Sequence, residues 1–328
     1  MIIPKKVLNV LKKQHYAVFC ETCGVQICRW NKKSLLDEGY CYKEKFYGIK
    51  SHLCCQMSPA VMWCYNRCLH CWRAIEYNLG KKLEKKDVKK PGKIIEECIK
   101  AQKKLLSGLK GNKRINIKKW EEAQNPKQFA ISLSGEPTIY PYIAELIKEL
   151  RKRRKTSFLV TNGLNPERLK ELEKKNALPT QLYISLNSPN KKMYEKWHNS
   201  LEKNAWKRFN QSLEIMNRLT KKKKTRTVLR MTLVKNINMK EEDIKGYVKL
   251  IKKASPMFIE VKGFMSVGYA RQRLGYETMP NHKEIKKFAK LLVRELKPNY
   301  KILDEKVESR VILLGKSKKE MKIKNNEI

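Results

Sequence analysis

Short apolar runs alternate with amphipathic stretches along most of the chain after Pro59. The runs are rich in apolar and β-branched residues, which is typical of buried strands. They predict strands at residues 60–63, 129–133, 157–160, 181–186, 228–233 and 258–261. The stretches between them repeat apolar residues with a helical period. They predict helices at residues 93–106, 143–152, 167–173, 206–219, 242–253 and 282–296.

Strands separated by helices indicate parallel βαβ units in an α/β fold. About six such units fit, fewer than the eight of a complete barrel, so the pattern predicts an incomplete (βα)6 barrel of the TIM type. A further apolar run at 310–314 predicts an edge strand. We therefore expect an irregular, cysteine-rich extension at 1–57, the partial barrel at 58–300, and an edge strand with a basic tail at 301–328.

The charge balance adds the expectation that the barrel binds a polyanion. The chain has 328 residues, with 74 Lys+Arg against 32 Asp+Glu, and a formal net charge of +42. A positive field of this size predicts a nucleic-acid partner, and an anionic membrane surface fits less well. No apolar run approaches the roughly 18 residues of a membrane helix, and residues 1–19 lack a signal-peptide core. We expect a soluble, cytoplasmic protein without a membrane partner.

Nine of the ten cysteines lie between Cys20 and Cys71. In a reducing cytoplasm such a group predicts metal binding rather than disulfides. Cys64, Cys68 and Cys71, at spacings of four and three residues, suit three irons of a 4Fe–4S cluster whose fourth iron stays open. Zinc is the alternative, but a structural zinc site takes four ligands, usually from two Cys-x-x-Cys pairs.

This cysteine triplet, followed by Trp72, resembles the signature of the radical S-adenosylmethionine (SAM) superfamily. The resemblance implies that the open iron binds SAM, which is cleaved to a 5′-deoxyadenosyl radical. It also implies that residues at the carboxyl ends of successive strands contact SAM. Each of them alone is compatible with a turn or a cap, and their common placement favours a shared site. The expected residues are Gly135, Glu136 and Pro137, then Thr161 and Asn162, then Ser185 and Asn187, with Arg230 in the fifth strand.

A second set of cysteines, Cys28, Cys41 and Cys54, is separated by two gaps of 12 residues. Spacing alone leaves open any three of Cys20, Cys23, Cys28, Cys41, Cys54 and Cys55. The order of the two triplets resembles that of the archaeal tRNA 4-demethylwyosine synthases, as do three further motifs. The likeness runs from about residue 25 to 314, and its motifs are Cys41-Tyr-Lys43-x-Lys-Phe-Tyr-Gly, Ser-Leu-Ser-Gly-Glu-Pro-Thr and Val267-Gly268-Tyr269.

The resemblance implies a reaction in which N1-methylguanosine at position 37 of tRNA-Phe gains a ring from two carbons of pyruvate. A radical formed at the N1-methyl group would attack the carbonyl carbon of pyruvate. Cys28, Cys41 and Cys54 would hold a second 4Fe–4S cluster, and Lys43 would form a Schiff base with pyruvate. Nothing in the sequence resembles the flavodoxin-like domain of eukaryotic relatives, so a separate flavodoxin or ferredoxin is expected to supply the electron to a monomeric enzyme.

Two other functions remain open at this level. One is a radical SAM activase that generates a glycyl radical in a partner protein. The other is a zinc-stabilised RNA-binding module that uses Cys20, Cys23 and Cys28 with further ligands. The net charge of +42 favours an RNA substrate over a protein substrate.

Overall fold

The computed structural model describes residues 2–327 and contains one ten-stranded sheet. Its six central strands are parallel and pair in chain order. They are β3 (Cys54–Ser58), β4 (Gln128–Ile131), β5 (Thr156–Thr161), β6 (Gln181–Ser185), β7 (Arg226–Leu233) and β8 (Phe258–Gly263). The two outermost strands of the sheet each pair on one side only, so the barrel is not closed. The incomplete (βα)6 barrel is confirmed.

Antiparallel strands extend both ends of this parallel core. At one end β3 pairs with β2 (Cys23–Gln26), which pairs with β1 (Ala17–Phe19). At the other end β8 pairs with β10 (Val311–Gly315), and β9 (Lys301–Lys306) lies outside it. The prediction of an edge strand at 310–314 is therefore wrong in its position. β10 is second from the edge because the chain first lays down β9 and then turns back between β9 and β8.

The first strand of the barrel is not where the apolar pattern places it. Residues 60–63 are buried, but they form turns and the start of a loop, and Met62 has a φ of +71°. The strand is the preceding Cys-Cys-Gln-Met-Ser segment of β3, which reads as polar. The predicted strand at 60–63 is wrong because those side chains are apolar for packing beneath a loop.

The amino-terminal 57 residues are also more regular than predicted. They contain β1, β2, most of β3 and three helices, namely α1 (Lys5–Lys13), α2 (Arg29–Leu35) and α3 (Tyr42–Tyr47). The boundary that we predict between residues 57 and 58 falls inside β3. This segment therefore continues the sheet of the barrel, and the expectation of an irregular extension is wrong.

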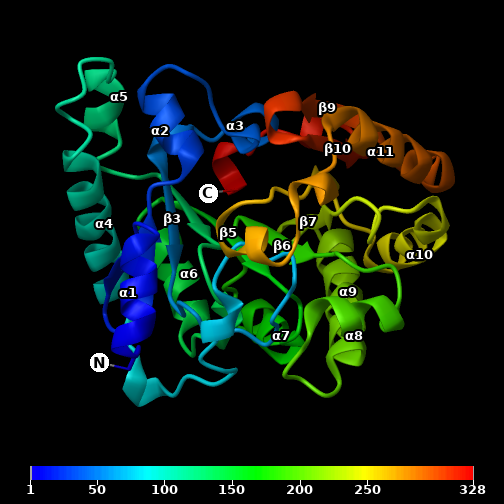
Figure 1. The fold of residues 1–328 in the computed structure, drawn as a ribbon, viewed down its shortest axis with the longest axis horizontal. Helices are drawn as coiled ribbons and strands as arrows, with labels where there is room; N and C mark the ends of the chain where they lie inside the picture. The colour runs from blue at the N-terminus through cyan, green and yellow to red at the C-terminus, as the bar shows by residue number, and fades with distance from the viewer. Residues whose placement is uncertain (1, 328) are drawn as a thin grey trace.

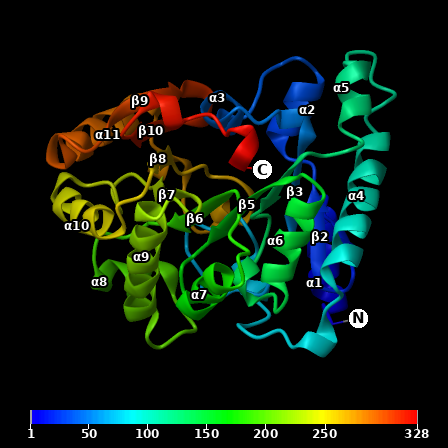
Figure 2. The same cartoon turned by 180° about the vertical axis from the view of Figure 1, so that it is seen from behind.

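Helices cover the outer face of the curved sheet, as Figures 1 and 2 show from opposite sides. The predicted helices at 143–152 and 282–296 are confirmed at their exact bounds, and the other four within a few residues. The covering helices are α4 (Pro91–Ser107), α6 (Ile143–Lys152), α7 (Pro166–Lys174), α8 (Lys191–His198), α9 (Ala205–Lys221), α10 (Ile244–Ala254) and α11 (His282–Leu296), whereas α5 (Ile117–Glu122) packs against α2.

One helix, α3, packs inside the half-barrel instead of outside it. Side chains alternate between the two faces of a strand. Phe158 of β5 and Tyr183 of β6 accordingly face inward and pack with Phe46 and Tyr47 of α3. Their neighbours along each strand, such as Leu159, pack in the core between sheet and helices. The interior of the barrel is therefore filled by a helix from the amino-terminal segment.

The carboxyl-terminal segment, from residue 320 onward, packs against α3 and covers this interior. The backbone N–H of Ile323 donates to the carbonyl of Tyr47 at 3.1 Å, and Met321 packs in the same cluster. Arg226, at the start of β7, is buried and donates to the carbonyls of Glu320 and Met321 at 2.7 Å. In both views the segment lies next to α3.

Within residues 2–327, every helix is too short or too polar to cross a membrane.

Candidate active site

The cysteine loop, residues 59–72, follows β3 at the carboxyl ends of the parallel strands. It is folded back by backbone hydrogen bonds from Cys64 N to the carbonyl of Gly80 and from Cys71 N to that of Cys68, at 2.9 and 3.0 Å. Burial raises the pKa of the Cys68 thiol well above its usual range, and the thiols of Cys64 and Cys71 raise it further. The structure thus brings the three predicted ligands close enough to interact electrostatically.

The cysteine loop fits an iron–sulfur cluster by its donors. Thiolates are the ligands of such clusters, and metal binding displaces the protons that burial otherwise retains. The Nδ1 atom of His70, inside the loop, is buried and has no hydrogen-bond partner within residues 2–327. No three His, Cys, Asp or Glu side chains of that range converge on a single metal ion. A cluster does not require this, because each thiolate binds a different iron.

The segment after β4 lies in backbone contact with the cysteine loop. Glu136 N donates to the carbonyl of Trp63 at 2.7 Å. Gly135 has a φ of +67°, and a β-carbon there would lie 1.9 Å from the carbonyl oxygen of Ala60. Only glycine fits both the left-handed backbone and this approach. The Ser-Gly-Glu-Pro motif therefore sets the position of the cysteine loop.

We expect the Gly135→Ala variant to lower the melting temperature and to lose iron from the first triplet. A non-glycine residue with a left-handed backbone costs about 1–3 kcal/mol, before the clash with Ala60 is added. Gly111→Ala is the matched control, since a β-carbon at Gly111 meets no atom within 4 Å. Thermal unfolding and iron analysis measure both effects. A Gly135→Ala protein with unchanged melting temperature and iron would contradict this role.

Glu136 joins the ends of β4 and β5. Its buried carboxylate accepts hydrogen bonds from the hydroxyls of Thr138 and Thr161, both at 2.7 Å, and from Asn162 N at 2.8 Å. Burial raises the pKa of this carboxyl, and these donors oppose the rise. The side-chain amide of Asn162 in turn lies 3.7 Å from Cys64 Sγ. Glu136 thereby orients Asn162 towards the first triplet.

The remaining residues expected to contact SAM lie on β6 and β7. Ser185 is the last residue of β6. Asn187 follows it, and its side-chain amide accepts from Thr232 N at 2.9 Å and lies 3.2 Å from Nε2 of His70. Arg230 pairs with Ser185 in the register of β6 and β7, and its charge acts on Lys43. The structure therefore gathers Gly135, Glu136, Pro137, Thr161, Asn162, Ser185 and Asn187 at one end of the strands, with Arg230 beside Ser185.

The second triplet is also brought together. Cys28 caps α2 and accepts from Asn31 N at 3.3 Å, and the Asn31 side chain donates to the carbonyl of Cys54 at 3.1 Å. Cys41 caps α3 and its N–H donates to Ser51 Oγ at 2.8 Å. Burial raises the pKa of the Cys41 thiol to about 12, with Cys28 adding to the rise. Cys28 likewise raises the pKa of Cys54, after burial.

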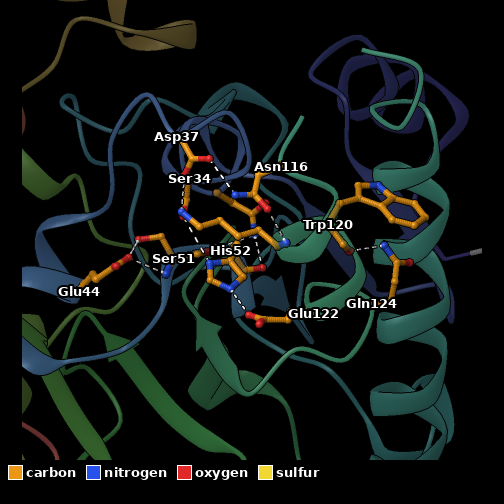
Figure 3. A network of polar contacts seen from close by, with 11 residues as sticks. Ser34, Asp37, Glu44, Ser51, His52, Asn116, Trp120, Glu122 and Gln124 are labelled. Atoms are coloured by element: carbon orange, nitrogen blue, oxygen red, sulfur yellow. Dashed lines mark hydrogen bonds and ion pairs between the residues drawn. The ribbon is translucent and has the colours of Figure 1, made fainter. Parts of the chain in front are cut away.

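A polar network supports the loop between the last two cysteines of this triplet (Figure 3). Glu44 accepts from the backbone N–H and the hydroxyl of Ser51, at 2.8 and 2.5 Å. His52 lies 2.8 Å from Glu122 of α5 through Nε2 and 3.4 Å from the Ser34 hydroxyl through Nδ1. Since the network ties α2, α3 and α5 together, it fixes the separation of the three cysteines.

The other cysteines lie away from these two triplets. Neighbouring residues of a strand face opposite sides, so Cys55 points away from the side of Cys54. Its Sγ lies 3.3 Å from that of Cys98 on α4, in the core between sheet and helix. Cys20 and Cys23 flank the turn between β1 and β2, where Cys23 Sγ is 3.7 Å from the carbonyl of Pro59.

Lys43 enters the barrel on α3, two residues after Cys41 of the second triplet. It is 8% exposed, and its Nζ lies 4.8 and 5.0 Å from the ring centroids of Tyr183 and Phe158. Burial lowers the pKa of Lys43, and the positive charge of Arg230 acts in the same direction. The carboxylate of Glu260 and the thiols of the triplet oppose this, but burial is the larger effect. The amine is thus biased towards its nucleophilic, neutral form.

In the chamber around Lys43 inside the barrel, two residues were not predicted from the sequence, Glu260 and Lys262 of β8. Glu260 is fully buried, and its two oxygens accept from the hydroxyls of Tyr42 and Tyr47, both at 2.8 Å. Burial lowers the pKa of Lys262 to about 8, and Arg230 adds to the shift. Charged residues at alternate positions of the apolar run Phe-Ile-Glu-Val-Lys-Gly were the available signal, since such a strand is otherwise buried on both faces.

Comparison with known proteins identifies the fold and the superfamily. The family model of the radical SAM superfamily matches residues 59–248, and the model for wyosine base formation matches residues 253–316. The chain is 36% identical to a solved structure of TYW1 with a lysine–pyruvate adduct bound, with a TM-score of 0.84 over 99% of both chains. A crystal structure of archaeal TYW1 is 35% identical, with a TM-score of 0.76 over 96% of both chains. The chain is a radical SAM enzyme.

Curated relatives define its family further. A SAM-dependent tRNA 4-demethylwyosine synthase of Pyrococcus abyssi is 48% identical over 95% of this chain and 89% of that protein. The corresponding protein of Methanocaldococcus jannaschii is 38% identical over 95% and 96%. The chain belongs to the family of SAM-dependent tRNA 4-demethylwyosine synthases. Membership decides against the activase and the zinc-stabilised module, and it implies SAM and a 4Fe–4S cluster as cofactors.

Proposed function

We propose that this chain condenses N1-methylguanosine at position 37 of tRNA-Phe with pyruvate to form 4-demethylwyosine, a step of wyosine biosynthesis. The observation that carries the proposal is the enclosed position of Lys43, beside the triplet of Cys28, Cys41 and Cys54. The similar TYW1 structure contains a lysine–pyruvate adduct, which agrees with a lysine of this kind as the site of pyruvate attachment.

Lys43 Nζ attacks the C2 carbonyl carbon of pyruvate, water leaves, and an imine holds the substrate in the barrel. Beside Lys43, the two cations Arg230 and Lys262 face the single carboxylate of Glu260 in this chamber. Glu260 already accepts two tyrosine hydroxyls, so the excess positive charge suits the carboxylate of a small keto acid.

Cys64, Cys68 and Cys71 would hold the SAM-binding 4Fe–4S cluster, which with SAM supplies the radical that removes a hydrogen atom from the N1-methyl group. Gly135, Glu136 and Pro137, with Thr161, Asn162, Ser185 and Asn187, shape the space next to that triplet for SAM. Cys28, Cys41 and Cys54 would hold a second 4Fe–4S cluster near the pyruvate. The two carbons retained from pyruvate complete the new ring, and its carboxyl carbon is released.

The basic surface serves the RNA. With a formal charge of +42, the chain attracts the phosphates of an anticodon stem–loop without regard to sequence. We further propose that the enzyme works as a cytoplasmic monomer and receives electrons from a separate flavodoxin or ferredoxin.

Anaerobic incubation of the reconstituted protein with SAM, dithionite, pyruvate and N1-methylguanosine-bearing tRNA-Phe tests this function. Mass analysis of the released nucleosides should show 4-demethylwyosine, and carbon-labelled pyruvate should place two labelled carbons in it. SAM cleavage without a new nucleoside, in the presence of all four components, would overturn the proposal.

A further inference from the structure

A cavity of about 410 Å³ lies where the open barrel leaves a gap between the amino-terminal segment and β8. Gln14, Gln26 and Trp30 line it on one side, and Lys262 and Val267 on the other. Trp72 of the cysteine loop also lines it. Its volume lies in the range of about 300–1,000 Å³ that is usual for small-molecule sites. The cavity therefore has room for a planar, partly apolar group.

Residues that line this cavity are neighbours of both cysteine triplets in the sequence and of the helix that carries Lys43 in space. Trp72 directly follows Cys71, and Trp30 is two positions after Cys28. Nζ of Lys262 lies 6.0 Å from the ring centroid of Tyr42, the residue before Lys43. A group bound in the cavity would thus contact the cysteine loop through Trp72 and lie next to Lys262, the residue that approaches α3.

Exposed apolar side chains gather around its mouth. Only six large hydrophobic residues of the described chain are exposed, and four of them lie on the segments that border this gap. Val267 and Tyr276 belong to the loop after β8, and Val307 precedes the lining residues Glu308 and Ser309. The fourth, Tyr40, lies 4.1 Å from Nζ of Lys306, which is also 5.9 Å from the ring of Trp30. Aromatic rings interleaved with cations are the surface that unstacked RNA bases prefer.

We propose that this cavity receives the everted guanine base of the RNA substrate, and that the indole of Trp30 stacks on it. The inference rests on the proposed function, which requires a base edge to leave its stack before it can react. The guanidinium of Arg73 lies 4.1 Å from the ring centroid of Trp72, whereas Nζ of Lys306 is 5.9 Å from that of Trp30, so Trp30 is the less covered indole and the one that we assign. The side-chain amide of Gln14 and the amide oxygen of Gln26, whose Nε2 donates to the carbonyl of Gln14 at 2.6 Å, supply polar groups for the edge of the base.

A double comparison of protein and RNA tests the stack. Dissociation constants are measured for the full, reconstituted protein with two anticodon stem–loops, one with N1-methylguanosine at position 37 and one abasic there. Removing the base should weaken binding to the unaltered protein by roughly 5- to 100-fold, the range for loss of one aromatic stack. In Trp30→Leu this penalty should shrink towards 1, and in Trp30→Phe most of it should remain.

Trp120→Leu is the matched control. Trp120 is also half-buried beneath a lysine, with Nζ of Lys110 at 5.0 Å, but it lies on α5, away from the cavity. It should keep the full penalty. The proposal is overturned if Trp30→Leu keeps the penalty of the unaltered protein, or if the unaltered protein shows none. Either result leaves the proposed function standing when the unaltered enzyme makes 4-demethylwyosine from intact tRNA, so the two failures are distinguishable.

Discussion

Replacing Lys43 by arginine is expected to abolish formation of the tricyclic nucleoside while SAM is still cleaved. Arginine keeps the positive charge but cannot form an imine, and loss of a covalent nucleophile costs on the order of 10³-fold or more. Because Nζ of Lys43 is enclosed by Phe158 and Tyr183, arginine also strains the chamber, so Lys43→Met serves as a slimmer second variant. Nucleoside mass analysis should detect no tricyclic nucleoside with either variant.

Lys45→Arg is the control on the same helix. Its ammonium pairs with Asp304 at 2.8 Å at the edge of the barrel, with 37% of the side chain exposed, so its replacement should leave product formation intact. Borohydride reduction in the presence of labelled pyruvate should fix the label on the peptide that contains Lys43. Ordinary product formation by Lys43→Met would remove the imine from the pathway.

Alanine at Cys28, Cys41 and Cys54 together is expected to remove about half of the iron and to uncouple SAM cleavage from product. Alanine at Cys64, Cys68 and Cys71 should remove the other half and abolish SAM cleavage. This follows from the proposal that each triplet supplies thiolates to a separate cluster, since a cluster without its thiolates is not retained. Iron analysis and quantification of 5′-deoxyadenosine measure the two effects independently.

The control removes the cysteines that lie elsewhere, Cys20, Cys23 and Cys98. Cys98 contacts Cys55 in the core between sheet and helix, and Cys23 lies beside Pro59, so their loss should leave the iron content unchanged. Full iron content in the variant lacking Cys28, Cys41 and Cys54 would contradict the second cluster there and turn attention to Cys20, Cys23 and Cys55.

The parallel strands from β4 to β8 were predictable because both of their faces are buried, which produces continuous apolar runs. β3 was not, since its inward side chains are Cys54, Gln56 and Ser58, which read as a polar segment. The neighbouring apolar residues 60–63 then took its place in the prediction. Their burial comes from contact with the loop around Gly135, a pairing 72 or more residues apart that local pattern does not reveal.

The residues of the candidate site also divide into those with a local sequence signal and those without one. The spacing of Cys64, Cys68 and Cys71 is enough to predict a metal site. Lys43, in contrast, is one of many lysines and was predicted only from its place in a matched motif. That α3 lies inside the barrel has no local signal, because its Tyr-Lys-Glu-Lys-Phe-Tyr sequence is compatible with a surface helix. The charged residues Glu260 and Lys262 stand out in an apolar strand of the sequence. Only the position of α3 in the structure explains why they are buried there.

The contact between the carboxyl-terminal segment and α3 also determines at what stage of synthesis the chamber of Lys43 can be enclosed. Nζ of Lys322 hydrogen-bonds the carbonyl of Glu44, 278 positions earlier in the chain. All the parallel strands of the barrel lie between these two positions in the sequence, so they are synthesised before Lys322 can reach Glu44. Contacts of such long range form late in folding. A nascent chain therefore carries the amine of Lys43 in an uncovered site, and the chamber is enclosed only after the whole barrel has been synthesised.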